Sequence, residues 1–361
     1  MKLSHHLITS YPLGQLVAIL TSFFAYIYTA TTLMAEVEIL EAEVVPVGKD
    51  WQIGFLEGPA PGKGNLLYFT NRNRDPNAEQ GIQQVDLAKP ELGATTVHTT
   101  RAGGLWYRNG ILRATVPVKN GDSRVVQFEG VDGKSAFADP RNLVSGKIHG
   151  RGLVAPNDLV RDAKGGTYFT DKNGKALYYI SPGGKTNLVA DYKDDGSTAN
   201  DTLEELNNPN GIILSPDGST LYVTDNSNIL HAKIASPGKL AAPLAHLLPG
   251  AGITEKPYHK IAGISPAPPR KNGRPAWIGK YGGNMNIDGM TVDAEGTIYG
   301  AGLSSGIVFG WDGKTCKLVR IVKCPGGAVN CTIARAGRNL LCVVGSFGIA
   351  TVKLPTTAPL E

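Results

Sequence analysis

The stretch "PNGIILSPDGSTLYVTDN" (residues 209–226) has the pattern of a β-hairpin: an apolar run, a Pro-Asp-Gly turn and a second apolar run. Short apolar runs on either side of such a turn predict two antiparallel strands. The same pattern occurs as "PNDLVRDAKGGTYFTD" (156–171) and as "IDGMTVDAEGTIYGAG" (287–302). This recurrence predicts a protein built from repeated units.

Three further segments follow the pattern more loosely, so six units are expected. They are "FLEGPAPGKGNLLYFTN" (55–71), "AGGLWYRNGILRATV" (102–116) and "VNCTIARAGRNLLCVVGSFGIATVKL" (329–354). The units begin near residues 57, 103, 157, 210, 288 and 330, and most continue into two further strands. Units of this length with four strands each are typical of propeller blades. The sequence therefore predicts an all-β, six-bladed β-propeller of four-stranded antiparallel blades.

The blades are expected to form one domain over residues 36–361, because a single blade cannot bury both of its faces. The strand-like segment "AEVEILEAEVVPV" (35–47) is expected to complete the sixth blade and close the ring. One wide gap between units predicts a long insert at about 229–287. A loop of that length is usually a lid or a partner surface.

The composition agrees with a turn-rich β protein. The chain of 361 residues contains 45 glycines and 23 prolines, as frequent turns require. The formal net charge of +5 is small for this length and is spread along the chain. We therefore expect no nucleic-acid partner.

The first 35 residues differ from the rest of the chain. No residue between Lys2 and Glu36 carries a formal charge, histidines aside, and residues 16–35 are mostly apolar. One interpretation is a cleaved signal peptide, which would make the protein exported to the periplasm or the medium. A second is an uncleaved membrane anchor, the only membrane contact expected. A third is that translation begins at Met34, which would leave the protein in the cytoplasm.

All four cysteines lie near the C-terminus, at positions 316, 324, 331 and 342. No two of them form a CxxC pair, which makes a zinc ribbon an unfavoured interpretation. In an exported protein one or two disulfides would brace the last part of the fold, whereas in a cytosolic protein buried thiols are expected. The sequence leaves both alternatives open.

Four oxygen-bearing side chains stand at the start of the innermost strand of their units: Glu57, Asn157, Asn210 and Asp288. In a propeller the first strands line the central channel, so residues at equivalent first positions converge on its mouth. Two carboxylates and two amides suit a hard divalent cation, with Ca²⁺ preferred and Mg²⁺, Mn²⁺ or Zn²⁺ as alternatives. The set contains no histidine or cysteine, so a structural zinc site is disfavoured.

A purely structural interpretation competes with this metal site. Asn-Gly and Asp-Gly pairs, such as Asn210-Gly211 and Asp288-Gly289, are common turn residues that satisfy backbone groups without any ligand. Glu57 does not fit this interpretation, because glutamate is a poor turn former. A carboxylate buried at that position requires a partner.

The motifs at these positions resemble those of the gluconolactonase, regucalcin (senescence marker protein) and luciferin-regenerating enzyme family. The resemblance covers residues 50 to 354 and rests on "EGPA" (57–60), "APNDLV" (155–160), "PNGIILSPDGSTLYVTD" (209–225), "IDGMTVDAEGTIYGA" (287–301) and "VNCTIA" (329–334). Each motif alone is weak, but together they occur in the right order at blade spacing.

The resemblance implies a hydrolase with a single divalent ion at the channel mouth, acting on a small-molecule lactone or related ester. Glu57, Asn210 and Asp288 would ligate the metal, and Asn157 would ligate it or hold the substrate. The metal would polarise the carbonyl and activate a water, with Asp288 as the candidate general base.

The chain also departs from the family pattern. Regucalcin-like members place an arginine two residues before the Asn157 position, and here that residue is Ala155, so Arg151 or an insert residue would have to replace it. This puts a sugar-lactone substrate in doubt.

Two alternative functions remain open from the sequence. The same ion would suit cleavage of phosphotriesters. The protein would otherwise be a non-catalytic exported propeller that binds a ligand or protein partner around a structural metal ion, since one fold hosts many functions.

Overall fold

The computed structural model describes residues 37–49, 51–73, 80–119, 121–148, 150–191, 206–226, 228–247, 286–303, 305–334 and 339–355. The expected leader, residues 1–35, lies outside these ranges. The blades all belong to one compact unit, Ile39–Glu361. Within the described ranges, none of the helices has the length and apolar character needed to cross a bilayer.

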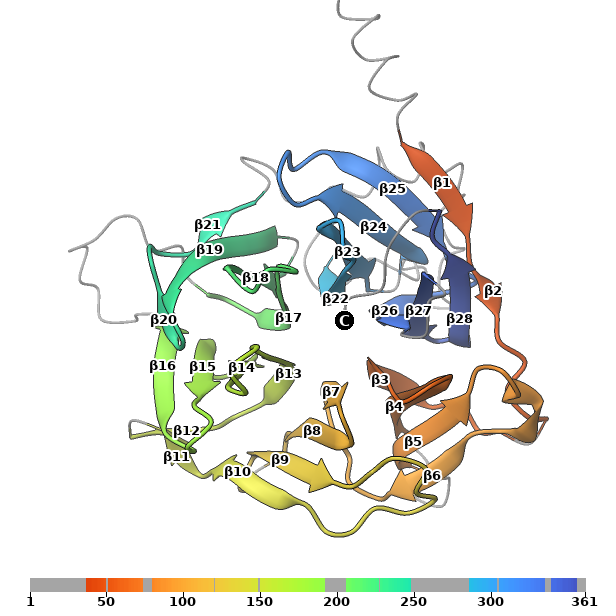
Figure 1. Cartoon of the computed structure of the whole chain (residues 1–361), viewed down its shortest axis with the longest axis horizontal. Coiled ribbons are helices and arrows are strands. Elements are labelled where there is room, and N and C mark those ends of the chain that lie inside the picture. The colour runs from red at the N-terminus through yellow and green to blue at the C-terminus, as the bar shows by residue number, and fades with distance from the viewer. Residues whose placement is uncertain are drawn as a thin grey trace, which may run out of the picture. The chain divides into compact units, whose positions relative to one another are not determined.

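Six small antiparallel sheets surround a common centre, which confirms the six-bladed β-propeller (Figure 1). The first sheet contains β3 (Phe55–Pro61), β4 (Leu66–Arg72), β5 (Gly81–Asp86) and β6 (Thr95–His98), with a short 3₁₀ helix η1 (Pro90–Leu92) between the last two. The second contains β7 (Leu105–Arg108), β8 (Ile111–Val116), β9 (Arg124–Glu129) and β10 (Arg141–Ser145). The third contains β13 (Pro156–Arg161), β14 (Thr167–Asp171), β15 (Ala176–Ile180) and β16 (Thr186–Asp191).

The other three sheets repeat this order from the centre outwards. The fourth contains β17 (Pro209–Leu214), β18 (Thr220–Asp225) and β19 (Asn228–Ser236), on which both β20 (Lys239–Leu240) and β21 (Ala245–His246) pair. The fifth contains β22 (Ile287–Val292), β23 (Thr297–Gly302), β24 (Ile307–Asp312) and β25 (Leu318–Lys323). The sixth contains β26 (Ala328–Ala334), β27 (Leu340–Gly345) and β28 (Gly348–Lys353). A two-stranded ribbon, β11 (Lys147–Ile148) with β12 (Arg151–Gly152), precedes the third sheet.

The segment before the first blade supplies the missing outer strands. β2 (Glu43–Val44) pairs with β28 and completes the sixth sheet, as expected from the early strand-like segment. β1 (Glu38–Glu41) adds a fifth strand beside β25. The first strands of the chain therefore join the last two sheets, which holds the ring closed.

The hairpin turns follow the sequence closely. Asn109 and Gly110 link β7 to β8 as a two-residue loop, and both have positive φ, as this kind of turn demands. In the turn between β17 and β18, the Gly218 N–H donates to the Ser215 carbonyl at 2.8 Å. Asp217 accepts the Ser219 N–H at 3.0 Å, so the polar turn residues fix the geometry of this hairpin.

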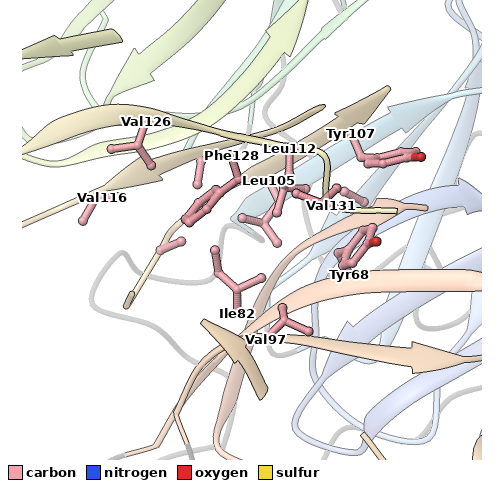
Figure 2. Packing of buried hydrophobic residues seen from close by; sticks show 13 residues of the cluster. Tyr68, Ile82, Val97, Leu105, Tyr107, Leu112, Val116, Val126, Phe128 and Val131 are labelled. Carbon is pink, nitrogen blue, oxygen red and sulfur yellow. The ribbon is translucent and has the colours of Figure 1, made fainter. Parts of the chain in front are cut away.

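Neighbouring blades pack face to face through apolar side chains. Between the first two blades, Tyr68, Ile82 and Val97 of one sheet meet Leu112 and Phe128 of the next, with almost no exposed surface (Figure 2). Equivalent clusters fill the interfaces between the second and third, third and fourth, fifth and sixth, and sixth and first blades. Burying apolar surface contributes about 25 cal/mol per Å², so these interfaces stabilise the ring.

Two details extend the sequence analysis. The insert expected at about 229–287 begins with strands β19, β20 and β21, because the fourth blade needs its outer strands; residues 248–285 lie outside the described ranges. All four cysteines are free thiols, with Cys331 and Cys342 buried and Cys316 and Cys324 half-buried. Burial raises the pKa of the Cys342 thiol to about 12, so it is an inert core group.

Candidate functional site

A β-bulge occurs near the start of five of the six innermost strands, whereas β7 of the second blade pairs regularly with β8. In β13, Asn157 and Asp158 stand between the paired residues Pro156 and Leu159, so two residues face one on β14. The same shift occurs in β17, β22 and β3. A bulge redirects side chains out of the regular alternation, and it includes Asn157, Asn210 and Asp288. Glu57 pairs with Thr70 directly before the bulge in β3.

We call the first residues of the innermost strands, at the channel mouth, the lips of the blades. A set of threonines that the sequence analysis did not single out fixes the backbone at these lips. Each stands on the second strand of its blade and donates its hydroxyl to a carbonyl of the following blade. Thr170 donates to Asn210 at 2.7 Å, and Thr224 donates to Asp288 at 2.9 Å. Thr115 donates to the carbonyl of Asn157, and Thr70 donates to that of Gly103 at 3.4 Å. The phrases "YFT" and "YVT" were the sequence signal for these contacts.

The structure brings the four predicted side chains together at the mouth. Asn157 donates its amide hydrogen to Oδ1 of Asn210, and the Asn210 side chain is hydrogen-bonded to Asp288. Asp288 in turn lies within electrostatic reach of Glu57. All four are buried, with 4–8% of their surface exposed. Residues from four blades thus form one cluster, although 231 positions separate Glu57 from Asp288 in the sequence.

The carboxyl groups in this cluster are unfavourably placed when they are charged. Burial and then the charge of Asp288 raise the pKa of Glu57 from 4.5 to about 8. Burial also raises the pKa of Asp288. Two buried carboxylates this close repel each other and lack solvent. The arrangement is favourable only when a proton or a cation compensates their charge.

Asp158 is a third buried carboxylate that the sequence analysis did not assign. It follows Asn157 in the bulge, and its Oδ2 accepts a hydrogen bond from Asn330 of the sixth blade at 3.1 Å. Its Oδ1 is buried and has no hydrogen-bond partner within the described part of the chain. Burial and then the charge of Asp288 raise its pKa to about 7. The motif "APNDLV" showed this carboxylate, but only the fold places it in the channel.

Two basic residues, Arg72 and Lys172, were also missed. Arg72 ends the second strand of the first blade, and Lys172 directly follows the second strand of the third blade. The positive charge of each lowers the pKa of Glu57, Asp158 and Asp288. Nη1 of Arg72 lies 3.9 Å from Oε1 of Glu57. The carboxylates at the mouth are therefore partly balanced by cations of the chain itself.

Asp171, the last residue of β14, has a structural role. Its carboxylate accepts the backbone N–H groups of Val154 at 3.0 Å and Ala155 at 2.7 Å. Asp225 accepts those of Asn207 and Asn208 in the same way. These carboxylates hold the loop before each lip and do not join the cluster.

The central channel contains a cavity of about 310 Å³. Its walls are the innermost strands beyond the lips, and Asp158 and Asn330 line it. None of the four lip residues does so. Asp158 thus borders both this cavity and the carboxyl cluster, and the candidate site is the mouth.

The donor set at the mouth suits an oxygen-loving cation. No group of three or more His, Cys, Asp or Glu side chains is arranged to hold a metal ion in the described ranges. The candidate donor set therefore combines two carboxylates with amide oxygens. These donors belong to Glu57 and Asp288 and to Asn157 and Asn210. Carboxylate and amide oxygens are the ligands that Ca²⁺ and Mg²⁺ prefer.

Comparisons with known proteins point to one family. Residues 116–239 match the model of the family described as SMP-30/Gluconolactonase/LRE-like region. The chain is 26% identical over 319 residues to Lactonohydrolase oryL of Aspergillus oryzae, a match that covers 80% of this chain and 65% of the relative. It is 23% identical over 236 residues to a gluconolactonase of Zymomonas mobilis, covering 60% of this chain and 55% of the relative. The match thus spans less than two thirds of each of these relatives.

Solved structures share the fold. A gluconolactonase from Xanthomonas campestris superposes with a TM-score of 0.57 at 20% identity, covering 84% of this chain and 87% of its own. Regucalcin from Agrobacterium tumefaciens, described as a calcium-binding protein, superposes with a TM-score of 0.57 at 15% identity, covering 90% and 99%. At these identities the similarity establishes the six-bladed architecture alone.

Proposed function

Residues 116–239 place this chain in the SMP-30/gluconolactonase/LRE-like family, and on that premise we propose that it is a divalent-metal-dependent hydrolase that opens a lactone. The observation that supports this most is the buried pair Glu57 and Asp288, which share the mouth with two amides and lack a full counter-charge. Relatives named lactonohydrolase, lactonase and gluconolactonase support the reaction class.

Glu57, Asn210 and Asp288 would hold the cation, with Asn157 as a further ligand or a substrate contact. Ca²⁺ is the preferred ion, because its oxygen sites tolerate mixed carboxylate and amide ligands. A bound divalent ion would supply Lewis acidity, which polarises a carbonyl and makes water more acidic. The described residues fit such an ion, since its charge would relieve the repulsion between the two buried carboxylates.

The residues of the chain would divide the chemistry among them. Asp288 would accept a proton from the attacking water as a new carbon–oxygen bond forms at the lactone carbonyl. When the ring carbon–oxygen bond breaks, that proton would pass to the departing oxygen, which leaves a hydroxy acid. Asn157 would donate the amide hydrogen that does not bind Asn210 to the substrate, and Thr224 would keep Asp288 in place through the backbone.

A substrate panel tests this function. The purified protein, with Ca²⁺, Mg²⁺, Mn²⁺ or Zn²⁺, is assayed on sugar, aliphatic and aryl lactones and on a phosphotriester. We expect metal-dependent lactone hydrolysis that Asp288→Ala reduces at least about a hundredfold, as loss of a general base does. Asp217→Ala, in the exposed turn after β17, is the matched control and should stay fully active. Equal inactivity of wild type and Asp288→Ala with every metal would leave a binding protein as the better assignment.

A further inference from the structure

The second blade lacks a side chain at its lip. Gly103 occupies the position that corresponds to Asn157, because its carbonyl accepts the Thr70 hydroxyl just as that of Asn157 accepts Thr115. A Cβ atom at Gly103 would lie 2.6 Å from Oγ1 of Thr115 and 2.8 Å from the carbonyl of Asn157. A side chain at this position would collide with these groups, so the second blade contributes none to this sector of the mouth.

Arg72 of the first blade fills this sector. Its Nε donates to the carbonyl of Ala102 at 2.7 Å, which anchors the guanidinium beside the glycine. Its Nη2 lies 3.2 Å from the point where a Gly103 Cβ would stand. Its Nη1 faces Glu57 at 3.9 Å, which is beyond hydrogen-bond distance. The guanidinium therefore occupies the sector of the mouth where the other blades place an oxygen-bearing lip side chain.

The guanidinium keeps an unused hydrogen-bond donor. Nη2 is shielded from solvent and has no hydrogen-bond partner within the described ranges, while 23% of the Arg72 side chain stays exposed at the mouth. A shielded charged donor without an acceptor is unfavourable. An acceptor oxygen brought by a ligand would remove that penalty, and a planar guanidinium binds carboxylates with two parallel hydrogen bonds.

The charges at the mouth also favour an anionic ligand once a cation is present. Three carboxylates, Glu57, Asp158 and Asp288, face two cations of the chain, Arg72 and Lys172. With all five ionised, a divalent ion would leave the mouth with one excess positive charge. A single carboxylate, or one oxyanion forming from a carbonyl, would neutralise it.

We propose that Arg72, assisted by Lys172, forms an anion subsite that binds the lactone carbonyl and, after ring opening, the carboxylate of the hydroxy-acid product. This inference rests on the proposed function, because it names the ligand chemistry of the same mouth. The other candidate, Arg151, is already engaged: its Nη1 pairs with Oδ2 of Asp191 at 2.6 Å on the outer strand of the third blade.

Binding of acids and their uncharged counterparts tests the subsite without any turnover. Calorimetric titrations of the full chain in CaCl₂ use 4-hydroxybutanoate against 1,4-butanediol, and D-gluconate against D-glucitol. We expect wild type to bind at least one acid more tightly than its alcohol. Arg72→Gln should lower the affinity for that acid by about ten- to a hundredfold, the usual effect of losing a hydrogen bond to a charged group. It should leave the alcohol unchanged, and Arg151→Gln should match wild type.

Calcium titrations of the same variants separate binding from positioning. Arg72→Gln should bind Ca²⁺ at least as well as wild type, because it removes a cation from the mouth. If it weakens Ca²⁺ and acid binding in parallel, Arg72 acts through Glu57 and the subsite is refuted. The subsite is also refuted if wild type prefers neither acid over its alcohol. Loss of acid binding in Arg72→Gln without lactone hydrolysis by wild type would uphold the subsite and reject the lactonase. Lactone hydrolysis by wild type with unchanged acid binding in Arg72→Gln would support the lactonase and refute the subsite.

Discussion

Replacing Glu57 by glutamine should change how the metal-free protein responds to pH. Burial and the charge of Asp288 raise the pKa of Glu57 from 4.5 to about 8, so folding favours its protonated form. A carboxyl with a higher pKa in the folded state binds a proton more tightly there. The free energy of unfolding must therefore fall as pH rises from the unfolded pKa to the folded one.

The size of this effect follows from linkage. Each pH unit within that window lowers the free energy of unfolding by about 1.4 kcal/mol for one group. From pH 4.5, the ordinary pKa of the group, to pH 7 the metal-free wild type should lose about 3 kcal/mol through Glu57. Glu57→Gln keeps the shape of the side chain and removes the titration, so this part of the slope should disappear.

Urea unfolding between pH 5 and pH 8, in a chelator, measures the slopes. Glu43→Gln, on the exposed outer strand β2, is the matched control and should run parallel to wild type. Saturating Ca²⁺ should flatten the wild-type curve, because a cation stabilises the ionised pair. Parallel curves for wild type and Glu57→Gln in chelator would show that Glu57 is not held in a strained, buried state, and the reasoning would fail.

Three further substitutions test the frame around the mouth. Thr224→Val removes the hydroxyl that binds the carbonyl of Asp288 in the fifth blade. Urea unfolding should show a free energy of unfolding lower by about 1–3 kcal/mol, the effect of an unsatisfied carbonyl, and calorimetry should show weaker Ca²⁺ binding. Unchanged values for both would contradict the role of the threonines. Gly289→Ala would drive a methyl group into the buried side chain of Asn330, so thermal unfolding should shift strongly downwards, whereas Gly183→Ala points into open space and should be neutral. Asp171→Ala leaves three backbone N–H groups, those of Val154, Ala155 and Gly174, without their acceptor and should lower the free energy of unfolding by about 2–4 kcal/mol. A loss of Ca²⁺ binding at full stability would instead assign Asp171 to the metal site.

The repeat made most of the fold predictable from the sequence. Hairpins such as residues 209–226 carry their own turn signals, and equivalent positions in a ring converge by geometry alone. For that reason the sequence alone was enough to group Glu57, Asn157, Asn210 and Asp288. What they bind stays a prediction.

The remaining features of the site depend on contacts between blades. Nothing in "TNRN" (70–73) indicates that Arg72 crosses to the next blade to cover Gly103, because the cause is an absent side chain in another unit. The hydrogen bond between Asn330 and Asp158 spans 172 positions and depends on the bulge in β13. Strands β19, β20 and β21 of the fourth blade fall within the range expected for the insert, because these outer strands have little periodic pattern in the sequence.

Anomalous diffraction from crystals soaked in Mn²⁺ tests the central claim most directly, because Mn²⁺ suits oxygen ligands and scatters anomalously. We predict one strong peak at the channel mouth, within about 2–3 Å of carboxylate oxygens of both Glu57 and Asp288 and of an Asn210 oxygen. The same soak of Asp288→Ala crystals should show no peak there. A mouth without a peak in wild-type crystals, with Glu57 and Asp288 held by protein groups alone, would contradict the account.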